Sequence, residues 1–172
     1  MFTANVGPSE MKQVRFGRWE VEADVEATAA SYAQRVQGAP EECGCLECRN
    51  FAAARATLYP TAAVQLFESL GVRPIREAEI WHNCEIRPGV HSYGGFMHVI
   101  GRILSGQDVK VPVGENIRQL CPEPVTPSFS IGFSADVQLV PDCFPKSGLF
   151  QIEFECQVPW VFREPDEGPT TA

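Results

Sequence analysis

"FSIGFSADVQL" (residues 129–139) and "LFQIEFECQVPWVF" (residues 149–162) are two stretches in which nearly every second side chain is apolar. A period of two predicts strands with one buried face. Only nine residues separate the stretches, so we expect neighbouring strands. Glu153 and Glu155 fall on the alternate positions and are expected to face solvent. The predicted inward set is Phe129, Ile131, Phe133, Ala135, Val137 and Leu139 in the first strand, and Phe150, Ile152, Phe154, Cys156, Val158 and Trp160 in the second.

Three further stretches earlier in the chain also alternate or are strongly apolar. "WEVEADVE" (residues 19–26) predicts the first strand, with its acidic residues on the wet face. "REAEIWHNCEI" (residues 76–86) and "FMHVIGRIL" (residues 96–104) predict a hairpin with a long loop between them. In the first arm, one face is expected to carry Ala78, Ile80, His82, Cys84 and Ile86.

Glycine and proline mark the less regular parts of the chain. Gly94 and Gly95 could bring backbone close to a ligand, but we favour a β-bulge at this point. Residues 105–127 contain four prolines and are predicted to form a loop.

Helices are predicted between the first and second strands. The alanine-rich residues 27–40 favour a short helix that ends near Gly38, and residues 49–59 favour another that Pro60 interrupts. A further helix follows Pro60 and ends at Gly71.

These elements predict an α+β fold in which a mostly antiparallel sheet of about five strands is covered on one face by a helical segment inserted after the first strand. A two-sheet β-sandwich with a helix at one end is the alternative. The length of 172 residues fits a single domain, 1–172, with flexible ends at 1–12 and 163–172.

Composition limits the function classes. The net charge of −8 and the absence of a basic run argue against nucleic acid and against an anionic membrane as partners. No signal peptide and no long apolar run is present, so we expect a cytoplasmic protein whose partner is another protein or a small molecule. Seven cysteines, an odd number, argue against a closed disulfide framework.

Three of these cysteines lie together in "CGCLECR" (residues 43–49). Thiolates are good zinc ligands, and Cys43, Cys45 and Cys48 occur on a short segment just before a predicted helix, whose free amide groups favour thiolates. The sequence therefore predicts a zinc site, with Arg49 adding positive charge beside the sulfurs. A redox dithiol formed by the C-x-x-C half is the other interpretation.

A tetrahedral zinc site needs a fourth ligand. His82 and Cys84 are the first candidates, because they follow the helices that the cluster begins and are predicted to share one strand face. A single cysteine on an apolar strand face is, however, more often a core residue. The remaining candidates are Cys121, Cys143, Cys156, His91 and His98.

"CGCLECR" resembles the C-x-C-x-x-C-R segment of the glutathione-dependent formaldehyde-activating enzyme family. The resemblance implies that Cys43, Cys45 and Cys48 are zinc ligands. It covers seven residues, and the upstream C-x-C and downstream C-x-x-C-G of that family have no counterpart here, so a second zinc site is not implied.

Two classes of function follow for a zinc protein. With four protein ligands the zinc is structural, and the function lies in binding a partner or ligand. With three, an open position would make a zinc-thiolate enzyme that acts on a small thiol adduct. No P-loop, dinucleotide-binding motif, G-x-S-x-G or H-E-x-x-H occurs, and we favour the structural zinc.

Overall fold

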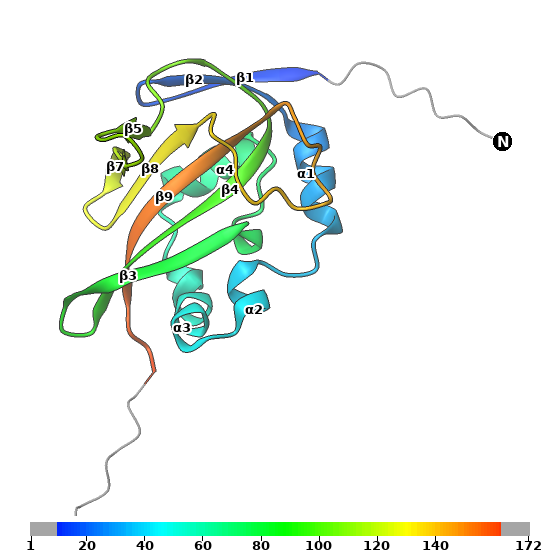
Figure 1. The fold of residues 1–172 in the computed structure, drawn as a ribbon. Helices are drawn as coiled ribbons and strands as arrows, with labels where there is room; N and C mark the ends of the chain where they lie inside the picture. The colour runs from blue at the N-terminus through cyan, green and yellow to red at the C-terminus, as the bar shows by residue number, and fades with distance from the viewer. Residues whose placement is uncertain (1–9, 163–172) are drawn as a thin grey trace, which may run out of the picture.

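Two long neighbouring strands form the centre of the fold. In the computed structural model, which describes residues 10–162, β4 (Val90–Ser105) pairs antiparallel with β9 (Leu149–Pro159) along the whole length of β9 (Figure 1). The other edge of β4 is shared by two strands placed end to end: β3 (Glu79–Arg87) pairs with its first half and β2 (Trp19–Asp24) with its second. The 16 residues of β4 therefore connect both ends of the sheet.

The main sheet has seven strands, and all of the pairings that join them are antiparallel. Their order is β1-β2-β4-β9-β8-β7, with β3 beside β4. A separate two-stranded hairpin, β5–β6, lies between β4 and β7 in the chain. The remaining strands are β1 (Met11–Phe16), β5 (Lys110–Pro112), β6 (Arg118–Leu120), β7 (Glu123–Thr126) and β8 (Phe129–Ser134).

Helices follow β2 and pack on the sheet, as Figure 1 shows. The Asp24 side chain accepts a hydrogen bond from the amide of Ala27 and so ends β2 and begins the first helix. The helices are α1 (Val25–Gln34), α2 (Ala39–Cys43), α3 (Leu46–Ala54) and α4 (Thr61–Ser69), with 3₁₀ turns η1 (Arg55–Thr57) and η2 (Pro74–Arg76). The predicted α+β fold is confirmed, with seven strands in place of about five and no closed barrel.

The hydrophobic core lies between the helices and the sheet. Aromatic rings contribute much of it: Phe129 stacks on Phe154 with ring centroids 5.7 Å apart, and Phe51 of α3 lies 5.6 Å from Tyr93 of β4. Tyr59 contacts the same group edge to face, 5.6 Å from Phe129. Paired aromatic rings add to the free energy gained from burial, so this cluster fixes the helical layer on the sheet.

The opposite face of the sheet is more polar and is partly covered by the β5–β6 segment. Backbone register places Glu79, Phe96, Glu153 and Gly132 in one row across four strands, and the side chains of the first three lie on this face. Glu153 is only 2% exposed and forms an ion pair with Lys110. Its predicted solvent exposure was wrong, because the residues expected to form an open loop cover it.

Three other expectations were also wrong. The 105–127 region contains β5, β6 and β7 rather than only a loop, and β1 includes Met11 and Lys12, which were expected to be flexible. Of the other residues predicted to be flexible, 1–10 and 163–172, only residue 10 is among the described residues. The β3–β4 loop is a tight turn, since β3 ends at Arg87 and β4 begins at Val90.

β8 is shorter than its alternating pattern. It ends at Ser134 because the Asp108 carboxylate accepts hydrogen bonds from the amide of Ala135 and the hydroxyl of Ser134, which turns the chain out of the sheet. Leu139, predicted to point inward, is 64% exposed and has a positive φ of 49°. A left-handed conformation costs a side chain such as leucine about 1–2 kcal/mol.

The predicted bulge at Gly94 and Gly95 is not present. Their pairing with Trp81 and Ile80 is regular, and a Cβ at either glycine would overlap the facing side chain. The register instead shifts between His82 and Cys84. Glycine thus allows the Trp81 ring to lie directly against the β4 backbone.

Candidate metal centre

The three predicted zinc ligands converge at the junction of α2 and α3. The Sγ atoms of Cys43, Cys45 and Cys48 all lie within 4.8 Å of one another, and they form the one group of three or more potential metal-ligating side chains found in residues 10–162. Cys43 is the last residue of α2, Cys45 is the N-cap of α3 and Cys48 lies in its first turn. The three cysteines are near enough to bind one metal ion.

Gly44 makes this convergence possible. It adopts a left-handed conformation with φ of 67° and ends α2, its amide donating to the carbonyl of Pro40 at 3.1 Å. A Cβ at this position would have no heavy atom within 4 Å, so backbone conformation, rather than space, favours glycine here. The chain therefore turns tightly between Cys43 and Cys45.

The thiols differ in their surroundings. Cys43 and Cys45 are exposed, whereas Cys48 is 8% exposed. Hydrogen bonds from the Cys45 backbone and from the other two thiols lower the pKa of Cys43. The pKa of Cys48 is raised, mainly because its thiol is buried. The Cys45 Sγ accepts from the Cys48 amide at 3.5 Å, so the start of α3 contributes a donor to the sulfurs. A metal ion would take the place of the thiol protons.

Arg49, which was expected to add positive charge beside the sulfurs, packs against Phe162. Its guanidinium carbon lies 5.3 Å from the ring centroid of Phe162, in cation–π geometry. The Arg49 side chain therefore contacts the segment that follows β9.

Buried polar contacts hold α3 against the sheet. The Tyr93 hydroxyl donates to the carbonyl of Glu47 at 3.0 Å. The fully buried Asn50 donates from Nδ2 to the carbonyl of Pro159 at 3.1 Å and accepts from the amide of Val161 at 2.8 Å. These contacts hold α3, whose N-terminal turn carries the thiols, against β4 and the end of β9.

A second buried network holds α2 in place. Arg55 forms ion pairs with Glu41, at 2.8 Å, and with the completely buried Glu77, at 3.0 Å. The Tyr59 hydroxyl donates to the same Glu77 oxygen at 2.7 Å, and the Glu77 carbonyl accepts from the Ala39 amide. No local motif marks Glu77, which appears in sequence as one of several alternating acids, so sequence reasoning missed this network.

The two predicted candidates for the fourth ligand do not share a face. His82 pairs with Tyr93, but after the register shift Cys84 pairs with Ser92, whose side chain points to the opposite face from Tyr93. The His82 ring lies 5.1 Å from that of Tyr93, on the face covered by α3, and Cys84 is exposed on the other face. Neither belongs to the three-thiol group, and a fourth protein ligand stays a prediction.

His82 forms a hydrogen bond with a second histidine of the hairpin. Its Nε2 lies 2.8 Å from Nδ1 of His91, whose own Nε2 lies 4.0 Å from the Glu85 carboxylate. The His91 ring packs on Trp160 at 4.6 Å. If His82 Nε2 carries the proton, its Nδ1 is a free electron-pair donor with an orientation fixed by His91.

The remaining candidates lie elsewhere. Cys156 and His98 are buried within the sheet, and Cys143 packs against the hydrophobic core. Burial lowers the pKa of His98 to about 4, and its Nε2 lies 2.8 Å from the Gln138 carbonyl, which is consistent with a structural, neutral imidazole. Cys121 follows β6 and donates its amide to the Val109 carbonyl.

Comparisons with models of protein families, with curated proteins and with solved structures found no match. The resemblance to the formaldehyde-activating family therefore rests on the seven residues 43–49 alone. None of the helices between residues 10 and 162 is both long enough and apolar enough to span a membrane.

Proposed function

We propose that the protein binds one zinc ion through Cys43, Cys45 and Cys48, that the ion stabilises the α2–α3 junction, and that the protein functions by binding a partner or small-molecule ligand. The mutual approach of the three sulfurs within 4.8 Å carries the proposal. Zinc–thiolate bonds of 2.3 Å in a tetrahedron require sulfurs about 3.8 Å apart, so small side-chain rotations suffice.

A structural role is supported by the helices that the cysteines join. α2 has five residues and α3 has nine, and helices this short have little stability of their own. An ion bound by the end of one and the beginning of the next would fix the angle between them. It would also cover the polar ends of both helices, where backbone groups lack helical partners.

We propose His82 as the fourth ligand in preference to Cys84. His82 is on the face covered by α3, and its hydrogen bond to His91 leaves Nδ1 available. The His91 ring would then act as the second-shell partner that orients a zinc-bound histidine.

The exposure of Cys43 and Cys45 favours one alternative, an open fourth position occupied by water or a substrate thiol. Zinc bound in this way would act as a Lewis acid or activate a thiolate, as expected for an enzyme acting on a small thiol adduct. The difference between the two functions is the presence or absence of a protein ligand in the fourth position.

Metal analysis by mass spectrometry, on protein purified under reducing conditions without chelators, tests the proposal. We expect one zinc per chain, lost in Cys43→Ser, Cys45→Ser and Cys48→Ser and retained in the control Cys121→Ser. Chelator competition should show weaker zinc affinity for His82→Ala than for Cys84→Ser. Equal, undiminished affinity in both variants would favour the open site. A metal-free protein with a reversible Cys45–Cys48 disulfide would establish the dithiol function instead.

A further inference from the structure

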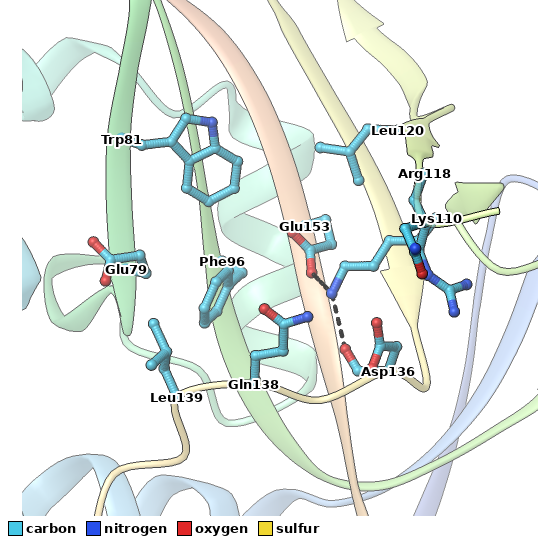
Figure 2. A pocket seen from close by; sticks show the side chains of 11 residues that line it. Glu79, Trp81, Phe96, Lys110, Arg118, Leu120, Asp136, Gln138, Leu139 and Glu153 are labelled. Carbon is cyan, nitrogen blue, oxygen red and sulfur yellow. Dashed lines mark hydrogen bonds and ion pairs between the residues drawn. The ribbon is translucent and has the colours of Figure 1, made fainter. Parts of the chain in front are cut away.

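A cavity of about 560 Å³ lies on the face of the sheet opposite the helices, between the β3–β4 hairpin and the β5–β6 segment (Figure 2). Its volume is within the range of small-molecule sites. Trp81 and Phe96 form one wall and Lys110 and Arg118 the other, with Glu153 between them, and Leu139 lies below Phe96 in the view of Figure 2. None of these residues belongs to the proposed zinc site.

Gly94 in β4 provides the space for the aromatic wall. The Trp81 ring lies against Gly94, where any side chain would overlap it, and is tilted by 52° to the Phe96 ring at a centroid distance of 6.2 Å. Trp81 is only half-buried, so part of its ring surface is available to a ligand. Aromatic faces carry negative electrostatic potential and attract cations.

Lys110 is held in the cavity wall by three acceptor oxygens. Its Nζ lies 2.8 Å from Oε1 of Glu153, 2.8 Å from the Asp136 carbonyl and 3.1 Å from Oε1 of Gln151. Two of the three ammonium protons are donated to the Asp136 carbonyl and to Gln151, and the contact with Glu153 is an ion pair. The Lys110 charge is therefore neutralised within the wall.

Glu153, by contrast, keeps acceptor capacity. Its side chain is 2% exposed, and within residues 10–162 its second oxygen, Oε2, has no hydrogen-bond partner. The pKa of this carboxyl group is raised. Burial is the main cause of the shift, and Lys110 opposes it. A positively charged ligand that contacts Oε2 would lower the cost of keeping the carboxylate ionised.

The rest of the lining is also richer in acceptors than in donors. Glu79 and Asp136 line the cavity, and neither forms an ion pair with a described residue. Arg118 is the one cation of the lining that is unpaired within the described chain, and it is exposed. Because Lys110 and Glu153 neutralise each other, two further carboxylates, Glu79 and Asp136, face one cation, Arg118.

We propose that this cavity binds a small organic amine in its ammonium form. The ammonium group contacts the faces of Trp81 and Phe96 and Oε2 of Glu153, while the apolar body of the ligand lies against Leu139. The net charge of −8 increases the local concentration of cations around the protein. The inference goes beyond the proposed function by assigning a ligand class to a second site, and it holds whether or not zinc binds.

Three probes of similar shape and different charge test the proposal: phenethylammonium, 2-phenylethanol and 3-phenylpropionate. Binding to the full chain at pH 7 is measured by calorimetry and by the NMR shifts of the tryptophan indole N–H signals. We expect phenethylammonium to bind at least tenfold more tightly than 2-phenylethanol and to shift the Trp81 signal, with 3-phenylpropionate weakest. Binding of the carboxylate as tight as that of the amine, or an unshifted Trp81 signal, would overturn the proposal.

Variants at positions with little role in the core locate the site. Trp81→Leu should weaken phenethylammonium binding about tenfold, and Asp136→Asn should weaken it about two- to threefold. Trp160→Leu, a matched change outside the cavity lining, should leave binding unchanged. Equal loss of affinity in Trp81→Leu and Trp160→Leu, or none in either, would contradict binding in this cavity. Circular dichroism of each variant verifies that it is folded.

Discussion

The Glu77 carboxylate and the Arg55 guanidinium form a buried ion pair of 3.0 Å that joins the segment leading into β3 to the turn after α3. Burial raises the pKa of Glu77 to about 7, because loss of hydration outweighs the attraction of Arg55 and the hydrogen bond from Tyr59. The two side chains join α2 and α3 to the sheet, and the raised pKa of Glu77 makes the strength of this attachment dependent on pH.

The pH dependence of stability should reveal this pair. In the unfolded chain Glu77 titrates near its ordinary pKa of 4.5, so between pH 4.5 and 7 the folded protein holds a proton that the unfolded chain has lost. Stability contributed by Glu77 is thus lost as pH rises through this range, by up to about 3 kcal/mol. Urea unfolding from pH 4.5 to 8 measures the decline. Glu77→Gln should flatten it, and Glu26→Gln, an exposed change, should not.

Tyr32 joins α1 to β4 through both hydrogen-bonding functions of its hydroxyl, which donates to the His98 carbonyl at 2.9 Å and accepts from the His98 amide at 3.0 Å. Tyr32→Phe leaves these buried backbone groups unpaired and should reduce the free energy of unfolding by about 1–3 kcal/mol. Chemical denaturation measures the loss. A change below 0.5 kcal/mol, which is about the effect expected at a surface position, would show that the two bonds contribute little.

Asn50 attaches α3 to the end of β9. Asn50→Ala removes two hydrogen bonds and leaves the Pro159 carbonyl and the Val161 amide without their partner, which should destabilise the protein by about 2 kcal/mol. Asn83→Ala, on the exposed part of β3, is the matched control and should cost less than about 0.5 kcal/mol. Similar losses in both variants would show that burial of Asn50 has no special importance.

Gly94→Ala should displace the Trp81 ring, because a Cβ at this position overlaps it. We expect a loss of about 1–3 kcal/mol in stability and a change in tryptophan fluorescence. Gly114→Ala is the control, since a Cβ there makes only ordinary contacts, of 3.5 Å and longer. If Gly94→Ala leaves both stability and fluorescence unchanged, the ring does not need the space above Gly94.

Removal of the proposed zinc ion by a chelator should affect the protein locally. Amide hydrogen exchange should accelerate in α2 and α3, which depend on the ion, and remain slow in the β4–β9 pair. Mass spectrometry of peptides from residues 39–54 and 149–159 makes the comparison. Uniform acceleration in both peptides would mean that the ion stabilises the whole domain, and no change in residues 39–54 would contradict a structural ion.

Much of the sheet could be predicted because one buried face gives a clear alternation. Trp19, Val21 and Ala23 are buried as expected, and so are Phe150, Ile152 and Phe154. The same rule failed at Glu153, because the other face of β9 is also covered there. The alternation within a strand gives no information about a segment, distant in sequence, that covers it. The prolines of residues 105–127 concealed that segment, since short hairpin strands tolerate proline at their edges.

The cysteine cluster could be predicted from spacing alone, because Cys43, Cys45 and Cys48 lie on one turning segment. The fourth position could not be predicted from strand alternation. The shift of register between His82 and Cys84 moves Cys84 to the other face, and nothing in the letters "HNCE" indicates where that shift occurs.

The pairing of β4 with β9 also sets the order in which the chain can fold. The paired positions are 49 to 69 residues apart, so the central contacts are distant in sequence and folding should be slow for a domain of this size. During synthesis the ribosome releases β4 well before β9, and until then one edge of the longest strand has no partner. The nascent protein therefore passes through a stage in which that edge is open to chaperones or to other chains.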